Sequence, residues 1–125
     1  MTTLDTAEIR RKTAELLRQR GWVKDEHLAD SAHPTECRLC LVEAIGQAAG
    51  LPPLSLSTAN KRAALLEPAY RGQYRAVRHT IAELAVALGW LETSTQGPMY
   101  WLLNWNDAAD RSVDDVLSVL EGQAV

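Results

Sequence analysis

The chain has 125 residues, enough for one domain that buries about two thirds of its unfolded surface. Its 46% hydrophobic content argues against disorder, and its net charge of −3 predicts no general affinity for nucleic acid or membranes. Two cysteines are too few for a disulfide scaffold and are typical of a reducing compartment. There is no signal-peptide pattern and no apolar stretch of ~20 residues. We therefore expect one soluble, cytoplasmic domain over residues 1–125, with no membrane partner.

The first half of the chain predicts two helices. The first begins after Asp5, a good capping residue, and ends at Gly21, which permits a left-handed stop. The second is predicted from Glu36 to Ala49, with Thr35 as its cap. It ends at Gly50, and the two prolines that follow prevent its continuation.

Residues 70–88 carry the clearest helical pattern of the chain, after a connection over residues 51–69 that contains at most a short helical turn. Apolar side chains recur there at steps of four and three residues, which places them on one face of a helix. We expect this seam to be buried, either inside the protein or across a homodimer. The seam consists of Tyr70, Tyr74, Val77, Ile81, Leu84 and Leu88.

Residues 93–105 are ambiguous. They begin with Thr-Ser-Thr-Gln-Gly-Pro, which is typical of a turn, and Met99 to Leu103 then fit a short strand or an irregular apolar segment. One such segment cannot form a sheet alone, and nothing else resembles a strand. The predicted fold class is therefore all-α, a compact bundle of four to five helices with one irregular or short extended segment near residues 93–105.

The C-terminal region combines a predicted turn with a predicted helix cap. Trp105, Asn106 and Asp107 are interpreted as the turn, since short amide and carboxylate side chains bond to their own backbone. Ser112 and Asp115 have the spacing of a capping box at the start of a last helix. We expect these five residues to have structural roles.

Two histidines and two cysteines form the pattern H-x5-H-x3-C-x2-C, whose residue types all ligate zinc. They are His27, His33, Cys37 and Cys40. A cysteine in the first turn of the second helix would also have a lowered pKa and could serve thiol chemistry. The alternative is a purely structural role, in which both cysteines pack as small apolar residues on the buried stripe of that helix. We expect core cysteines and no cofactor, with a zinc-stabilised or thiol-active small domain as an alternative.

Basic residues gather around the start of the seam helix. Arg71, Arg75 and Arg78 step along one flank of that helix, and Lys61 and Arg62 precede them. Such a face can follow the phosphates of a nucleic acid, on which Tyr70 or Tyr74 could add stacking. The alternative is intramolecular pairing, because the last 25 residues hold five acidic residues against one arginine.

Two blocks of the sequence together resemble a family of short uncharacterised bacterial and phage proteins, a domain of unknown function. The resemblance spans most of the chain and assigns the family's cysteine, which precedes a Leu-rich helix, to Cys40. It implies no established activity and favours an accessory protein of a phage or mobile element that binds a host component. The blocks are Cys37-x-x-Cys40-Leu41-x-x-Ala44-x-x-x-Ala48 in mid-chain, and Trp105-Asn106-Asp107, Arg111-Ser112 and Asp115-Val116 near the end.

The leading interpretation is a non-enzymatic binding module that presents a helical surface to another protein. A nucleic-acid-binding protein that uses the basic helix face is the second interpretation. We assign no catalytic residue, because no spacing brings a nucleophile to a particular base.

Overall fold

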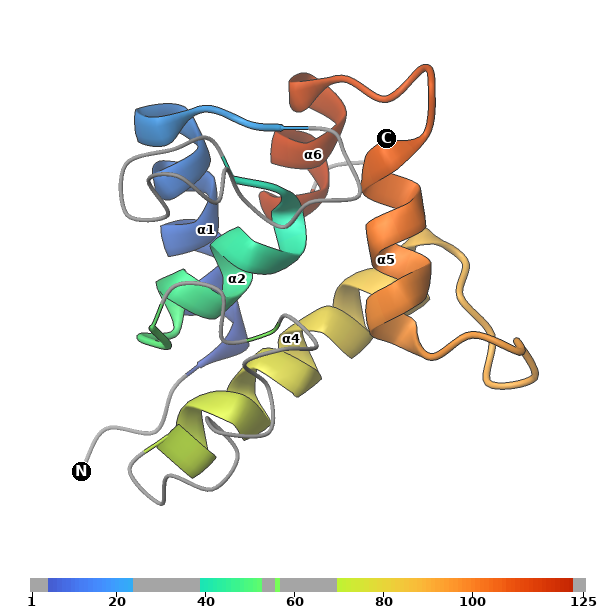
Figure 1. Ribbon diagram of the computed structural model, residues 1–125, viewed down its shortest axis with the longest axis horizontal. Helices are drawn as coiled ribbons and strands as arrows, with labels where there is room; N and C mark the ends of the chain where they lie inside the picture. The colour runs from blue at the N-terminus through green and yellow to red at the C-terminus, as the bar shows by residue number, and fades with distance from the viewer. Residues whose placement is uncertain (1–4, 24–38, 53–55, 57–69, 123–125) are drawn as a thin grey trace.

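The computed structural model describes residues 5–23, 39–52, 56 and 70–122, and these ranges contain five α-helices and no strand (Figure 1). The predicted all-α class is confirmed. No helix among the described residues is both long and apolar enough to cross a membrane. The helices are α1 (Thr6–Arg20), α2 (Leu41–Ala48), α4 (Arg71–Leu88), α5 (Pro98–Asp107) and α6 (Val113–Leu120).

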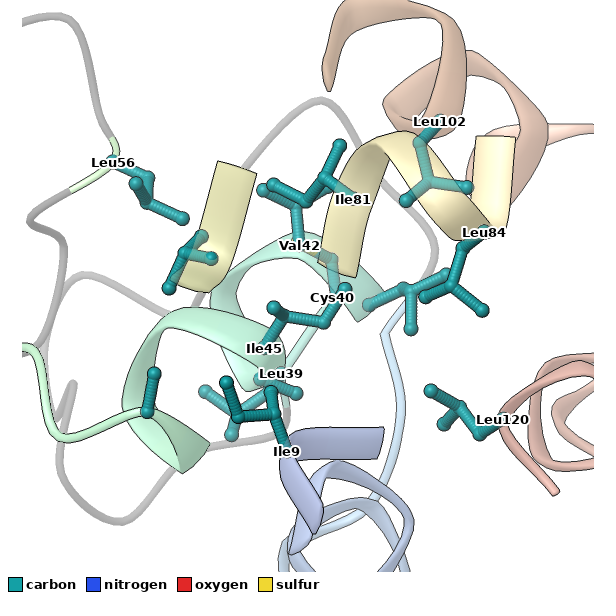
Figure 2. Packing of buried hydrophobic residues seen from close by; sticks show 14 of the residues in the cluster. Ile9, Leu39, Cys40, Val42, Ile45, Leu56, Ile81, Leu84, Leu102 and Leu120 are labelled. Atoms are coloured by element: carbon teal, nitrogen blue, oxygen red, sulfur yellow. The ribbon is translucent and has the colours of Figure 1, made fainter. Parts of the chain in front are cut away.

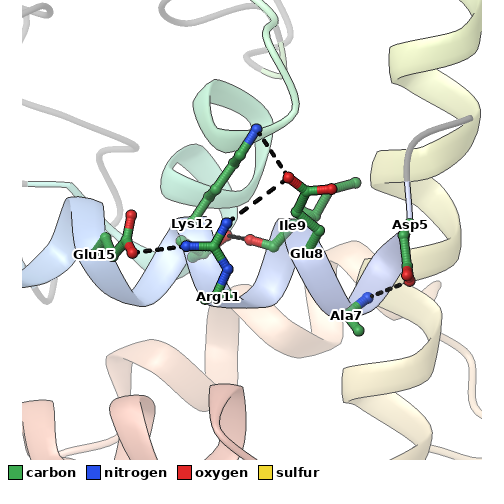
Figure 3. Close-up of polar contacts among 8 residues, drawn as sticks. Asp5, Ala7, Glu8, Ile9, Arg11, Lys12 and Glu15 are labelled. Atoms are coloured by element: carbon green, nitrogen blue, oxygen red, sulfur yellow. Dashed lines mark hydrogen bonds and ion pairs between the residues drawn. The ribbon is translucent and has the colours of Figure 1, made fainter. Parts of the chain in front are cut away.

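Helix α1 forms as its sequence predicts. The Asp5 carboxylate accepts a hydrogen bond of 2.9 Å from the backbone N–H of Ala7 and so caps the first turn. On the outer face, Arg11 lies between Glu8 and Glu15 and pairs with both (Figure 3). The helix ends at Gly21, whose φ of 87° is unfavourable for other residues.

Helix α4 is the longest helix of the described chain and packs against α5, α1 and α2 (Figure 1). Its predicted seam faces the interior: Tyr74, Val77, Ile81 and Leu84 are buried. Gly89 ends the helix in the left-handed conformation, with φ of 115°. The opposite face of α4 is therefore free to carry polar side chains.

A single apolar cluster joins the helices. Side chains from α1, α2, α4, α5 and α6 converge on it, and α2 lies at its centre (Figure 2). The cluster is dominated by branched aliphatic residues, each fully buried example of which contributes roughly 1.5–3 kcal/mol. The residues labelled in Figure 2 are Ile9, Leu39, Cys40, Val42, Ile45, Leu56, Ile81, Leu84, Leu102 and Leu120.

The start of α2 differs from the prediction. Leu39 and Cys40 are not helical: Leu39 pairs its backbone with Gly21 and Val23, and Cys40 is extended, with φ of −76° and ψ of 167°. The helix begins at Leu41 instead of Glu36, because the backbone before it is used to hold the end of α1. Cys40 therefore does not lie inside the helical stripe that the sequence predicted.

The expected extended or irregular segment near residues 93–105 is irregular only over residues 93–97. Residues 98–107 form α5, with Gly97 at the N-cap and Pro98 in the first turn, a position that proline favours. Leu102 is fully buried, so tertiary packing against α4 selects the helix. The predicted turn at Trp105, Asn106 and Asp107 is the last turn of this helix.

Candidate functional site

The outward face of α4 carries Arg71, Arg75 and Arg78, and all three side chains are exposed. Helical spacing brings them onto one stripe, about a quarter to a third of a turn away from the buried Val77 and Ile81. They line a surface hollow of about 630 Å³ that extends to the start of α5. The hollow is lined by Arg71, Tyr74, Arg75, Arg78, His79, Ile81, Ala82 and Pro98.

The positive charge of this basic hollow is not neutralised by the rest of the described chain. Arg71, Arg75 and Arg78 form no ion pair with any residue that the structure describes. By contrast, Arg11 pairs with Glu8 and Glu15. The alternative of intramolecular neutralisation is therefore not seen within the described ranges.

Three of the five C-terminal acidic residues are engaged elsewhere. Asp115 accepts from the backbone N–H of Ser112, Asp107 accepts from the side chain of Asn106, and Glu121 pairs with Arg18. These interactions hold α6 and α5 in place and lie apart from the basic hollow. Lys61 and Arg62, the other predicted basic residues, lie outside the described ranges.

A second hollow follows directly along α4. It is open, has a volume of about 610 Å³, and shares His79 and Ala82 with the basic hollow. Its other lining residues are Glu83, Val86 and Ala87. Val86 is 59% exposed, so this hollow presents apolar surface to solvent. The α4 surface thus changes from basic to apolar along its length.

Cys40 is a core residue at the N-cap of α2. Its Sγ accepts the backbone N–H of Glu43 at 3.4 Å, and the residue is fully buried. The pKa of the Cys40 thiol is raised from 9.0 to about 12, mainly by burial. The hydrogen bond from the Glu43 N–H lowers this pKa, and the negative charge of Glu43 raises it. The neutral thiol that results is a poor nucleophile.

The zinc pattern is only partly covered by the described chain. His27, His33 and Cys37 lie outside the described ranges, and the described residues contain no group of three side chains suited to a metal. Zinc ligation therefore remains a prediction from the sequence.

The side chain of Asn106 makes four hydrogen bonds. Its carboxamide oxygen accepts from the indole Nε1 of Trp22 at 2.6 Å and from the backbone N–H of Leu41 at 3.1 Å. Its nitrogen donates to the carbonyl of Val23 at 3.2 Å and to Asp107 at 3.0 Å. With an exposed fraction of 0%, Asn106 ties α5 to the end of α1 and the start of α2.

The rest of the C-terminal motif is also structural. The guanidinium of Arg111 lies 3.9 Å from the ring centroid of Trp105 and donates through Nε to the Trp105 carbonyl at 2.8 Å. Ser112 caps α6, and both hydrogen bonds of the capping box with Asp115 are present. The motif therefore fixes the turn between α5 and α6.

The sequence analysis did not single out Glu43, whose residue is 1% exposed. Its carboxylate accepts from Gln47 at 2.8 Å, and Gln47 in turn accepts from Arg20 of α1 at 2.7 Å. Burial raises the pKa of the Tyr74 hydroxyl, and the charge of Glu43 adds to this effect. A buried carboxylate thus lies between α1, α2 and α4, and no periodic signal marks it in the sequence.

The described helices, with their basic hollow on α4, define a small all-α protein with a candidate anion-binding surface. Comparison with protein families matches residues 1–124 to a family of unknown function, DUF6197. The chain belongs to this family. No curated protein and no solved structure matched the chain.

Proposed function

We propose that the protein is a non-enzymatic binding module and that the α4 surface binds an acidic segment of a partner protein. The observation that carries the proposal is the set of three exposed arginines in the basic hollow, which form no ion pair with any described residue. The planar guanidinium group of arginine binds a carboxylate through two parallel hydrogen bonds. Asp or Glu residues of a partner would therefore supply the acceptors for these three arginines.

A protein partner fits this surface better than a nucleic acid does. Tyr74 is 5% exposed and packs in the core, and Tyr70 is partly buried against the same core, so the two rings have little free surface on which a base can stack. The exposed Glu83 carboxylate lies on the next stretch of α4 and would repel a phosphate backbone that continued along the helix.

The test compares two fluorescein-labelled probes by anisotropy: a short polyglutamate peptide and a single-stranded oligonucleotide of similar charge. We expect the wild-type chain to bind the peptide more tightly, with affinity that falls between about 50 and about 200 mM salt. Arg75→Glu removes one contact and adds a repulsive one, so peptide binding should weaken at least about tenfold.

A matched control and two contrary outcomes make this test decisive. Arg11→Glu has the same change in net charge on the exposed face of α1 and should leave peptide binding unchanged. Tighter binding of the oligonucleotide, lost in Arg75→Glu, would replace this proposal with the nucleic-acid alternative. Binding of neither probe would refute an anion-binding role for the surface.

We further propose that the natural partner is a host protein met in the cytoplasm and that the chain is an accessory protein of a phage or mobile element. This part is supported by the sequence resemblance described above. A second copy of the chain is the competing partner, and light scattering at increasing concentration separates the two: a chain that stays monomeric requires a different protein.

A further inference from the structure

The α4 surface has a second feature beyond its charge. Large apolar side chains exposed in the described chain are Val86, Leu91, Tyr100 and Val113. The first three fall between residues 86 and 100, which cover the second half of α4, the connection after it and the first turn of α5. Val86 also lines the second hollow, so a partner's apolar side chain seated there would remove it from water.

The basic and apolar parts of α4 form one continuous stripe. Arg75 and Val86 are eleven positions apart, a rise of about 16 Å along the helix, and differ by little in angle around its axis. The two hollows that they line share His79 and Ala82, so they adjoin along the helix. One segment of a partner can therefore contact both.

We infer that the partner segment is acidic and amphipathic, with a large apolar residue about 16 Å from its acidic cluster. This inference rests on the proposed function and specifies its ligand. The carboxylates lie against Arg71, Arg75 and Arg78, and the apolar residue covers Val86 beside Ala82. Charge sets the register, because Glu83 in the second hollow disfavours a carboxylate at that end.

The experiment uses the full chain and a pair of labelled peptides. Each peptide has a run of glutamates, an alanine-rich spacer, and a pair of residues that is either two leucines or two serines. Each is made with the glutamates at the N-terminal end and again with the glutamates at the C-terminal end. We expect the leucine peptide to bind about tenfold more tightly than the serine peptide in one order, because a leucine side chain is removed from water.

Two variants then locate the contact. Val86→Ser should abolish the preference for leucine, whereas Val113→Ser, a matched change at an exposed valine of α6, should retain it. Arg75→Glu should weaken both peptides alike. Equal binding of both peptides to the wild-type chain would overturn this inference and leave the proposed function standing, and binding of neither would refute the proposed function itself. A preference that survives Val86→Ser would also overturn the inference.

Discussion

Replacing Asn106 with alanine tests whether one buried amide joins three segments of the fold. In the folded protein the side chain accepts from Trp22 and Leu41 and donates to Val23. In the alanine variant these three partner groups remain, and each loses its hydrogen bond to Asn106. The backbone N–H of Leu41 is the most costly, since it is buried and no water can replace the lost acceptor without rearrangement.

The expected loss follows from these three groups. A buried donor without a partner costs about 1–3 kcal/mol, and each half-buried group loses a bond worth about 0.5–1.5 kcal/mol. Alanine regains roughly 0.5 kcal/mol through its higher helix propensity. We expect Asn106→Ala to lower the free energy of unfolding by about 1.5–5.5 kcal/mol, with a central value of about 3.5 kcal/mol, a large part of the stability of a domain this size.

Urea denaturation followed by circular dichroism measures this change, and Asn104→Ala is the matched control. Asn104 is in the same helix, is exposed, and makes a single exposed hydrogen bond to Gln96 at 3.1 Å. Its replacement should change the free energy of unfolding by less than about 0.5 kcal/mol. A loss below about 1 kcal/mol for Asn106→Ala, or equal losses for the two variants, would refute the role given to Asn106.

Three further outcomes are expected from the described contacts. Because the pKa of Cys40 is raised from 9.0 to about 12, the folded state disfavours the thiolate. The stability linked to this group is therefore complete below pH 9 and is lost as the pH rises from about 9 to 12. Cys40→Ala should flatten the decline in the free energy of unfolding that is measured over this window. The same neutral, buried thiol should react with iodoacetamide at pH 8 far more slowly in native Cys37→Ser protein than in the same variant in urea, and equal rates would contradict its burial. Ser112→Ala removes the cap of α6 and should cost about 1 kcal/mol in thermal or urea unfolding, whereas Ser118→Ala in the middle of the same helix should be nearly neutral.

The sequence predicted those elements whose signals are local. The seam of α4 was visible because Val77, Ile81 and Leu84 recur with the period of a helix and the opposite face is polar. The capping box at Ser112 and Asp115 depends on residues three positions apart, so it could be read from the chain directly. The arginines of the basic hollow were likewise selected by their spacing along one helix.

The errors arose where distant contacts decide the structure. Cys40 looked like part of a helix, but the backbone of Leu39 pairs with Gly21 and Val23, residues that lie far away in sequence. Helix α5 was missed because apolar residues occupy consecutive positions from Met99 to Leu103, which hides the helical period. The burial of Glu43 and the absence of ion pairs at Arg75 with described residues could be established only by the packed structure.

The Trp-Asn-Asp block therefore has a structural role that is separate from the binding role proposed for the α4 surface. The Trp-Asn-Asp block is accounted for by packing: Asn106 bonds the ends of two helices, and Trp105 stacks under Arg111. These contacts stabilise the core against which α4 packs, while the arginines of α4 point away from it. Stability and binding should therefore be separable, since Asn106→Ala acts on interior hydrogen bonds and Arg75→Glu acts on an exposed charge. The Trp-Asn-Asp block therefore reports how the chain folds, and we expect the proposed partner to bind on α4.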